Sequence, residues 1–168
     1  LKKGEKIQLE EDVEAEVLDT PGHTFAHLCF LVRVQGKANC LFSGDTLFNA
    51  GVGNCHNGGD PEVLFETICH QLKDIDDEVK LYPGHEYLGN NLKFTLAKEK
   101  DNTAAKALLS EYTKENRDES FIVTNMQKER EINTFFRLNS QSLRKNLSLE
   151  EASEKEVFLT LRNDRNKW

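Results

Sequence analysis

Long apolar runs are absent from this sequence, and so is an excess of positive charge. No run approaches about 18 apolar residues, so a transmembrane helix is not expected. No apolar segment follows the N-terminal Leu1-Lys2-Lys3-Gly4-Glu5, which does not fit a signal peptide. The formal net charge of −7 argues against general nucleic-acid binding, which needs clustered Lys and Arg. We therefore expect a soluble protein that binds neither nucleic acid nor membranes.

The cysteines lack the spacing of a redox or metal motif. Cys29, Cys40, Cys55 and Cys69 form no CxxC pair, and all but Cys55 lie in apolar stretches. Buried thiols fit a reducing compartment, so we expect a cytoplasmic location, or a mitochondrial one if a transit peptide precedes this sequence. The chain starts without Met, which leaves open a fragment, a mature product or the ordered part of a longer chain.

The chain changes character near residue 88. Its 168 residues, of which 38% are apolar and 30% charged, suit one domain or a domain with an appendage. Residues 1–88 alternate strand patterns with one helix, which Asp60 and Pro61 begin as N-cap and first helical residue. The predicted strands cover residues 13–17, 28–34, 40–42 and 79–82.

Residues 89–168 are predicted to be all helical. We expect helices over residues 91–100, 103–116 and 128–138, with a connector over 117–124. Ser148 and Glu151 have the spacing of a capping box and predict a last helix that runs to about Arg165. The expected apolar face of that helix contains Val157, Phe158 and Leu161.

Three residues that follow strand patterns are candidate metal ligands. His23, Asp45 and His85 each lie next to a glycine at the end of a predicted strand. Neutral imidazole and carboxylate are standard ligands of zinc and iron, and the two oxygens of Asp45 allow it to bridge two ions. We therefore predict a two-metal site for hydrolysis, with Asp45 as its catalytic residue. His27 is interpreted as structural support for the loop.

The same segments resemble a known family. Thr20–His27 resembles the TPGHTxGH motif of the metallo-β-lactamase fold, and Ser43–Phe48 with Gly51–Gly53 resembles TGDTLF…GCG of hydroxyacylglutathione hydrolase, or glyoxalase II. Gly84–Tyr87 and Asn90–Phe94 are similar to the GHEY…NNLKFA segment of that family. The tail that ends in Leu-Arg-Asn-Asp-Arg also resembles its C-terminal region, so the resemblance covers nearly the whole chain.

The resemblance implies a fold, a metal set and a substrate site. The fold would be α+β: a metallo-β-lactamase-like αββα sandwich, N-terminally incomplete over residues 1–88, followed by a helical glutathione-binding domain over 89–168. His23 would complete the first metal site, Asp45 would bridge both metals, and His85 would complete the second. The glutathione part of the substrate would be contacted by Tyr87, Asn91, Arg162 and Arg165, the last standing where a Lys is usual.

Two features depart from the family pattern. Asn54-Cys55-His56 stands where a basic residue and an aromatic pair are usual, which leaves a related thiol carrier open as an alternative to glutathione. The HxHxDH motif, from which the family draws its other metal ligands, is absent. Loss of the first strands would leave an open sheet edge and uncovered apolar surface, so we expect aggregation or self-association of this chain.

The expected reaction is hydrolysis of a thioester such as S-D-lactoylglutathione to a 2-hydroxy acid and a free thiol. Two divalent ions would be the cofactors, with zinc first and iron or manganese as alternatives. The other interpretations are a persulfide dioxygenase of the same superfamily and a non-catalytic truncated paralogue. Within the chain, Tyr87 as a core residue and the basic tail as a complement to a helix C-terminus are the structural alternatives.

Overall fold

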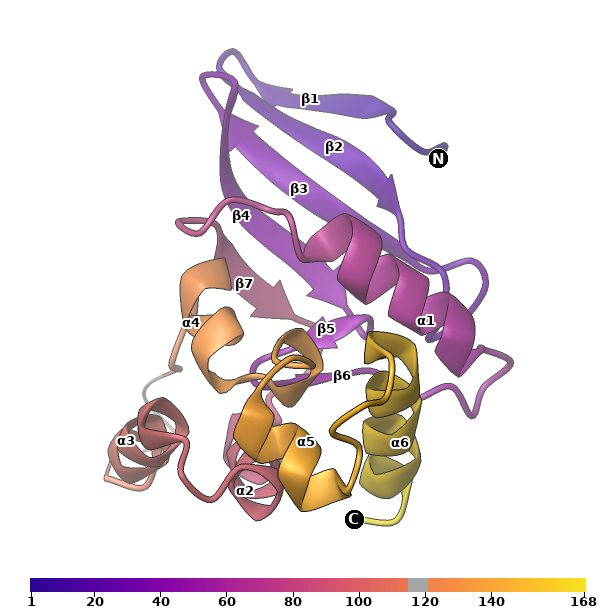
Figure 1. The fold of residues 1–168 in the computed structure, drawn as a ribbon. Coiled ribbons are helices and arrows are strands. Elements are labelled where there is room, and N and C mark those ends of the chain that lie inside the picture. Colours follow the sequence, from indigo (N-terminus) through magenta and orange to yellow (C-terminus); the bar gives the residue numbers. More distant parts are fainter. Residues whose placement is uncertain (115–120) are drawn as a thin grey trace.

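The computed structural model describes residues 1–114 and 121–168, and Figure 1 shows its strands at one end and most of its helices at the other. The strands are β1 (Lys6–Glu10), β2 (Val13–Asp19), β3 (Leu28–Val34), β4 (Lys37–Gly44), β5 (Leu47–Phe48), β6 (Gly51–Val52) and β7 (Lys80–Pro83). The helices are α1 (Pro61–Thr67), the π-helix η1 (Ile68–Leu72), α2 (Leu88–Lys98), α3 (Thr103–Tyr112), α4 (Met126–Ile132), the 3-10 helix η2 (Thr134–Phe136), α5 (Gln141–Leu147) and α6 (Glu154–Asn166).

One five-stranded sheet runs in the order β1-β2-β3-β4-β7. Strands β1 to β4 pair antiparallel with their neighbours, and β7 lies parallel to β4. Strands β2, β4 and β7 therefore run in one direction, so their C-terminal ends meet at one edge of the sheet. The short β5–β6 hairpin lies beside that edge (Figure 1).

Helix α1 covers one face of the sheet and begins where the sequence predicts (Figure 1). The Asp60 carboxylate accepts hydrogen bonds from the backbone N–H groups of Glu62 and Val63, at 2.8 and 2.9 Å. The buried apolar face of α1 and η1 packs in one cluster with sheet residues Leu31, Leu41 and Leu81. That face consists of Leu64, Phe65, Ile68, Cys69 and Leu72.

The opposite face of the sheet carries exposed aromatic side chains. Phe30, Phe42 and Tyr82 are register partners on β3, β4 and β7, so their side chains share a face. Phe42 is 48% exposed and stacks on Tyr82, with ring centroids 5.4 Å apart. Among the described residues, α1 thus covers one face of the sheet, and Phe42 on the other face is exposed.

Helices α2 to α6 gather at the end of the sheet that holds the hairpin (Figure 1). Phe94, Phe135 and Phe158 are fully buried there, in the same apolar cluster as the leucines of the sheet. The core thus crosses residue 88, and the division into domains 1–88 and 89–168 stays a prediction. Among the helices of the described residues, none combines the length and apolarity that spanning a bilayer requires.

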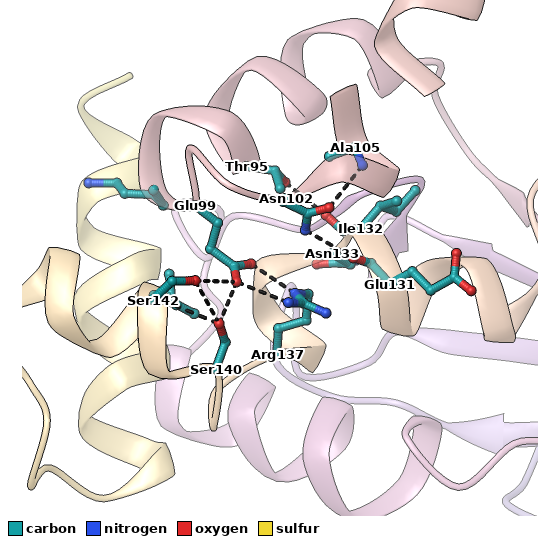
Figure 2. A network of polar contacts seen from close by, with 12 residues as sticks. Thr95, Glu99, Asn102, Ala105, Glu131, Ile132, Asn133, Arg137, Ser140 and Ser142 are labelled. Atoms are coloured by element: carbon teal, nitrogen blue, oxygen red, sulfur yellow. Dashed lines mark hydrogen bonds and ion pairs between the residues drawn. The ribbon is translucent and has the colours of Figure 1, made fainter. Parts of the chain in front are cut away.

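An ion pair between the buried Glu99 and the partly exposed Arg137 holds the helical region together (Figure 2). Glu99, at the end of α2, is 0% exposed and accepts hydrogen bonds from Arg137 Nε at 2.8 Å and Nη2 at 3.1 Å. Ser140, the N-cap of α5, also donates to this carboxylate. The hydrogen bonds that Arg137 donates to Glu99 raise the pKa of Arg137. Because Glu99 accepts charge-assisted hydrogen bonds from both Arg137 and Ser140, it fixes the end of α2 against the segment that joins η2 to α5.

The predicted start of the last helix is wrong. Ser148 has a φ of 56° and closes α5 in the left-handed conformation. The capping box of α6 is formed by Ser153 and Glu156, which have the same spacing five residues later. Local spacing does not choose between the two serines; the choice follows from packing, because Val157, Phe158 and Leu161 are buried as predicted.

Other helix boundaries also differ from the prediction. Helix α2 begins at Leu88 rather than residue 91, and α5 was not predicted. The expected helix over 128–138 is divided, because Asn133 leaves the helical conformation and caps η2 through a hydrogen bond from the Phe135 N–H. Helix α3 ends at Tyr112. The expected helical residues 115–116 and connector residues 117–120 lie outside the described residues.

Candidate metal centre and substrate pocket

The three predicted metal ligands meet at the edge of the sheet. His23 follows β2, Asp45 follows β4 and His85 follows β7, so parallel strand direction brings them together. Asp45 lies between the two imidazoles: its Oδ1 is 3.4 Å from His85 Nε2, and its Oδ2 is 3.7 Å from His23 Nε2. Each carboxylate oxygen thus faces a different histidine.

A backbone carbonyl fixes the orientation of His23. Its Nδ1 lies 2.6 Å from the carbonyl oxygen of Asn54. Because a carbonyl only accepts hydrogen bonds, Nδ1 carries the proton, and in the neutral ring Nε2 presents a lone pair toward Asp45. This arrangement is the usual one for a metal-ligating histidine, whose second nitrogen is held by an outer hydrogen bond.

His27 supports Asp45 from behind, as the sequence predicts for a structural residue. Its Nε2 accepts the Asp45 backbone N–H at 3.0 Å, and its Nδ1 lies 2.9 Å from Thr46 Oγ1, to which it donates. Burial lowers the pKa of His27, with a smaller contribution from His23 in the same direction. Gly44 has a φ of 49°, and a Cβ there would lie 2.7 Å from the His27 ring. The turn before Asp45 therefore requires glycine.

The donor separations match two adjacent metal positions. Zinc bonds of about 2.0–2.2 Å at a tetrahedral angle place neighbouring ligand atoms about 3.4 Å apart. The separations of 3.4 and 3.7 Å fit one ion between His85 and Asp45 and another between His23 and Asp45. The described part of the chain has no group of three His, Cys, Asp or Glu side chains that holds one ion. Each position thus has two donors, whereas catalytic zinc usually has three.

All four predicted substrate residues line one cavity of about 270 Å³. The cavity lies between the β5–β6 hairpin, the start of α2 and the end of α6. Its walls also include Asn54 and His56, from the segment that departs from the family pattern. The lining residues are Phe48, Val52, Asn54, His56, Tyr87, Asn90, Asn91, Arg162, Arg165 and Asn166.

Two of the predicted substrate residues have most of their polar atoms bound to the protein. Arg162 is 5% exposed, and its Nη1 donates to the carbonyls of Val52 and Gly53 at 3.0 and 2.8 Å. Burial lowers the pKa of Arg162 to about 10. Asn91 donates from Nδ2 to the Asn49 carbonyl at 2.9 Å and accepts from Arg165 at 3.1 Å. These two side chains therefore shape the cavity wall.

Tyr87 and Arg165 are more available to a ligand. Tyr87 is 45% exposed, stacks on His85 and packs edge-on against Phe48, so it joins the metal centre to the cavity. Burial lowers the pKa of Arg165, and no carboxylate contributes to that shift. Among the described residues, no carboxylate contributes to the pKa shift of Arg162 or Arg165, an arrangement that suits an anionic ligand.

The sequence interpretation missed several residues of this site. The backbone carbonyl of Asn54 holds His23, and the type of the Asn54 side chain gives no signal for that role. Glu129, fully buried beside the hairpin, gave no local signal, because a Glu in a helix pattern normally faces solvent. The glycine-rich character of residues 49–59 was the available clue that a backbone-mediated site lies there.

Comparison with known proteins agrees with this geometry. A profile of the family described as "Hydroxyacylglutathione hydrolase C-terminus" matches residues 86–168. Two curated relatives named hydroxyacylglutathione hydrolase, from Polaromonas sp. (strain JS666) and Nitrosococcus oceani, are each 47% identical over 174 residues. These alignments cover 100% of this chain and 65% of each relative. The chain thus spans less than two thirds of the length of these relatives.

Solved structures confirm the fold class. A crystal structure of ETHE1 from Myxococcus xanthus is 21% identical with a TM-score of 0.58, covering 99% of this chain and 52% of that one. A metallo-beta-lactamase from Staphylococcus aureus subsp. aureus COL is 20% identical with a TM-score of 0.56, covering 97% of this chain and 43% of that one. The family profile and the curated relatives thus show similarity to hydroxyacylglutathione hydrolases along the whole chain, and the solved structures show a metallo-β-lactamase-like fold.

Proposed function

We propose that this chain takes part in metal-dependent hydrolysis of a glutathione thioester, S-D-lactoylglutathione or a close analogue. The net reaction adds water across the C–S bond: the hydroxyl joins the carbonyl carbon and the proton goes to sulfur, giving a 2-hydroxy acid and a free thiol. The observation that carries the proposal is the position of Asp45, whose two oxygens face His85 and His23 at 3.4 and 3.7 Å.

Two divalent ions are the proposed cofactors, with zinc first and iron or manganese as alternatives. Asp45 Oδ1 with His85 would hold one ion, and Asp45 Oδ2 with His23 the other; each ion needs further donors beyond this pair. When bound, such ions supply Lewis acidity and lower the pKa of a bound water. The protein contributes the orientation of the donors, through the Asn54 carbonyl on His23 and the His27 ring on Asp45.

The cavity beside the metal centre is the proposed substrate site. Arg165, without a carboxylate partner contributing to its pKa, would bind a carboxylate of the peptide, and Tyr87 would lie along the thiol-bearing part near His85. Asn91 would hold Arg165 in place, and Arg162 would hold the cavity wall. In this proposal residues 89–168 supply three of the four predicted residues of the substrate site, Asn91, Arg162 and Arg165.

The test measures metal and turnover on one sample. Metal content by plasma mass spectrometry and hydrolysis of S-D-lactoylglutathione are compared for the wild type, Asp45→Asn and His70→Ala. His70 lies on η1 beside Glu66, away from the centre, and serves as the matched histidine control. We expect bound metal and turnover in the wild type and His70→Ala, and loss of both in Asp45→Asn. Equal metal content in the wild type and Asp45→Asn would contradict the proposed ligand role.

A non-catalytic chain that binds a thiol peptide is the second candidate. It is favoured by the absence, among the described residues, of any three-donor metal group. In that case the wild type would hold no metal and show no turnover, while calorimetry would still detect glutathione at the cavity. The persulfide dioxygenase interpretation is not favoured, because the curated relatives carry the hydroxyacylglutathione hydrolase name.

We also propose a reducing compartment, with the cytoplasm first and a mitochondrion as the alternative. All four cysteines are free. Burial raises the pKa of the Cys29 thiol to about 11 and that of Cys69 to about 12, so both stay protonated and unreactive at neutral pH.

A further inference from the structure

The turn of the β5–β6 hairpin is held by side chains that come from four separate places in the helical region. We call residues 47–53 the site hairpin. Each residue from Asn49 to Gly53 has one backbone group hydrogen-bonded to one of these side chains: the Ala50 N–H donates, and the other four residues accept through their carbonyls. No two of the four side chains lie in the same helix. The four holding residues are Asn91 of α2, Glu129 of α4, Asn133 between α4 and η2, and Arg162 of α6.

Glu129 is the charged member of this set. It is 0% exposed, and its Oε2 accepts the Ala50 N–H at 2.8 Å and Asn133 Nδ2 at 3.2 Å. Its Oε1 accepts the Thr124 hydroxyl at 2.6 Å, and Asn49 in turn donates to that hydroxyl. Burial raises the pKa of Glu129 to about 7, while these hydrogen bonds oppose the shift. No cation is among the groups that set this pKa.

The carboxylate holds a backbone conformation that alanine rarely adopts. Ala50 has a φ of 57°, in the left-handed region, where a Cβ is unfavourable. The hydrogen bond from the Ala50 N–H to Glu129 and the one from Asn133 to the Gly51 carbonyl lie on either side of this strained residue. Without the carboxylate, the turn is expected to relax away from positive φ.

The site hairpin leads directly into the metal centre. Gly53 packs so closely that a Cβ there would lie 2.0 Å from the Asp45 carbonyl and 3.1 Å from His23 Nδ1. The next residue, Asn54, supplies the carbonyl that fixes the His23 ring at 2.6 Å. A change in the turn at Ala50 therefore reaches His23 through four covalently linked residues.

We infer that Glu129 is a positioning residue, which orients the His23 imidazole by holding the site hairpin in its left-handed turn. A merely stabilising role explains the arrangement less well, because burying a carboxylate without a cation costs free energy. The inference concerns the same centre as the proposed function and rests on it only for the assignment of His23 as a ligand.

The primary test observes the His23 ring without metal or substrate. Long-range proton–nitrogen NMR spectra report the tautomer of each of the five histidines, and amide spectra report residues 49–54. In the wild type we expect a protected Nδ1 proton on His23. Glu129→Met should lose that proton and shift the amides of the site hairpin, because Ala50 then has no acceptor. Glu129→Gln should retain both, since its amide oxygen still accepts from Ala50 and its NH₂ group can donate to Thr124.

Two further variants separate positioning from general damage. Glu99→Gln alters an equally buried carboxylate that binds Arg137 and does not touch the site hairpin, so it should leave the His23 signal unchanged. Ala50→Gly in the Glu129→Met background should restore the signal, because glycine adopts positive φ without the carboxylate. If Glu129→Met retains the wild-type His23 and hairpin signals, or if Glu99→Gln moves them equally, the positioning role is overturned.

Zinc titration gives the second readout. Outer partners of metal-ligating histidines typically change metal affinity about 10–100-fold, so Glu129→Met should weaken zinc binding about 10-fold while Glu129→Gln stays near the wild type. Unchanged affinity in Glu129→Met would count against the inference. Because the ring spectra need no metal, failure of the hydrolase proposal alone would leave their result intact.

Discussion

The sheet and the helical region depart from the usual distribution of side chains in opposite directions. The sheet leaves aromatic groups outside: Phe42 is 48% exposed on the face away from α1. The helical region places charged groups inside, with Glu99 and Glu129 both fully buried. Exposed aromatic patches usually mark a contact surface, and buried charges usually mark a specified network. We therefore propose different tasks for the two regions, association for the sheet face and positioning for the helical interior.

Within the helical region, the two buried carboxylates also differ. Glu99 is paired with Arg137 and joins helices to one another (Figure 2). Glu129 is held by hydrogen-bond donors, with no cation among the described residues contributing to its pKa, and it joins the helical region to the site hairpin. The Glu99 network connects helices to one another, whereas the Glu129 network connects the helices to the hairpin that leads to the candidate metal centre.

The largest expected effect comes from breaking the ion pair. Arg137→Met leaves the Glu99 carboxylate buried without its cation and should lower the free energy of unfolding by about 3–5 kcal/mol. Urea denaturation measures this change. Lys155→Ala is the control, because the Lys155–Glu62 pair is solvent-exposed and should contribute much less to stability than the Arg137–Glu99 pair. Equal effects from both variants would remove the distinction between the buried pair and a surface pair.

The second prediction concerns the pH dependence of Glu129. Its pKa is raised from 4.5 to about 7 in the folded state, so folding favours the protonated acid. This contribution is fully present below the unfolded pKa and is lost as pH rises through about 7. The free energy of unfolding of the wild type should therefore fall by about 3 kcal/mol relative to Glu129→Gln between about pH 4.5 and pH 7.

Urea titrations of both proteins across this pH range give the comparison. Taking the difference between the two cancels the titration of the other carboxylates, which they share. A difference that stays constant with pH would show that Glu129 does not titrate there. A difference of the opposite sign would mean that its hydrogen bonds outweigh its burial.

The third prediction concerns Asn91, which contributes both to the stability of the protein and to the wall of the cavity. Asn91→Ala removes the donor to the Asn49 carbonyl, in a buried setting, and the acceptor for Arg165, in a partly buried one. We expect a loss of about 1–2 kcal/mol in the free energy of unfolding and weaker glutathione binding by calorimetry. The neighbouring Asn90 is exposed, so Asn90→Ala should change stability by less than about 0.5 kcal/mol. Unchanged glutathione binding in Asn91→Ala would place the ligand elsewhere.

The smallest expected effect on stability comes from the exposed sheet face. We propose that this chain self-associates through it, and Phe42→Lys should shift the protein toward monomer in sedimentation velocity. Its free energy of unfolding should change by less than about 0.5 kcal/mol. Phe25→Lys is the control, because Phe25 is 63% exposed in a loop away from the strands. A wild type that is monomeric at all concentrations would refute the proposal.

Local patterns predicted much of the fold. The N-cap at Asp60, the apolar face of α1 and the buried face of α6 follow from short-range rules and are confirmed. The same rules failed where two solutions are locally equivalent, as with the capping boxes at Ser148 and Ser153. They also failed at Asn133, where a polar side chain ends one helix and begins another.

The sequence by itself determined which residues approach the metal centre. Local patterns identify His23, Asp45 and His85 as candidates, because each lies next to a glycine after a strand pattern. The sheet topology then brings the three strand ends to one edge. Tertiary structure alone decided how they are held, because the holding groups are distant in the chain. Arg162 donates to the Val52 carbonyl, 110 positions away in the sequence. Glu129 accepts from the Ala50 N–H, 79 positions away. Such contacts depend on how helices pack against the hairpin, and no local pattern of residues encodes that packing.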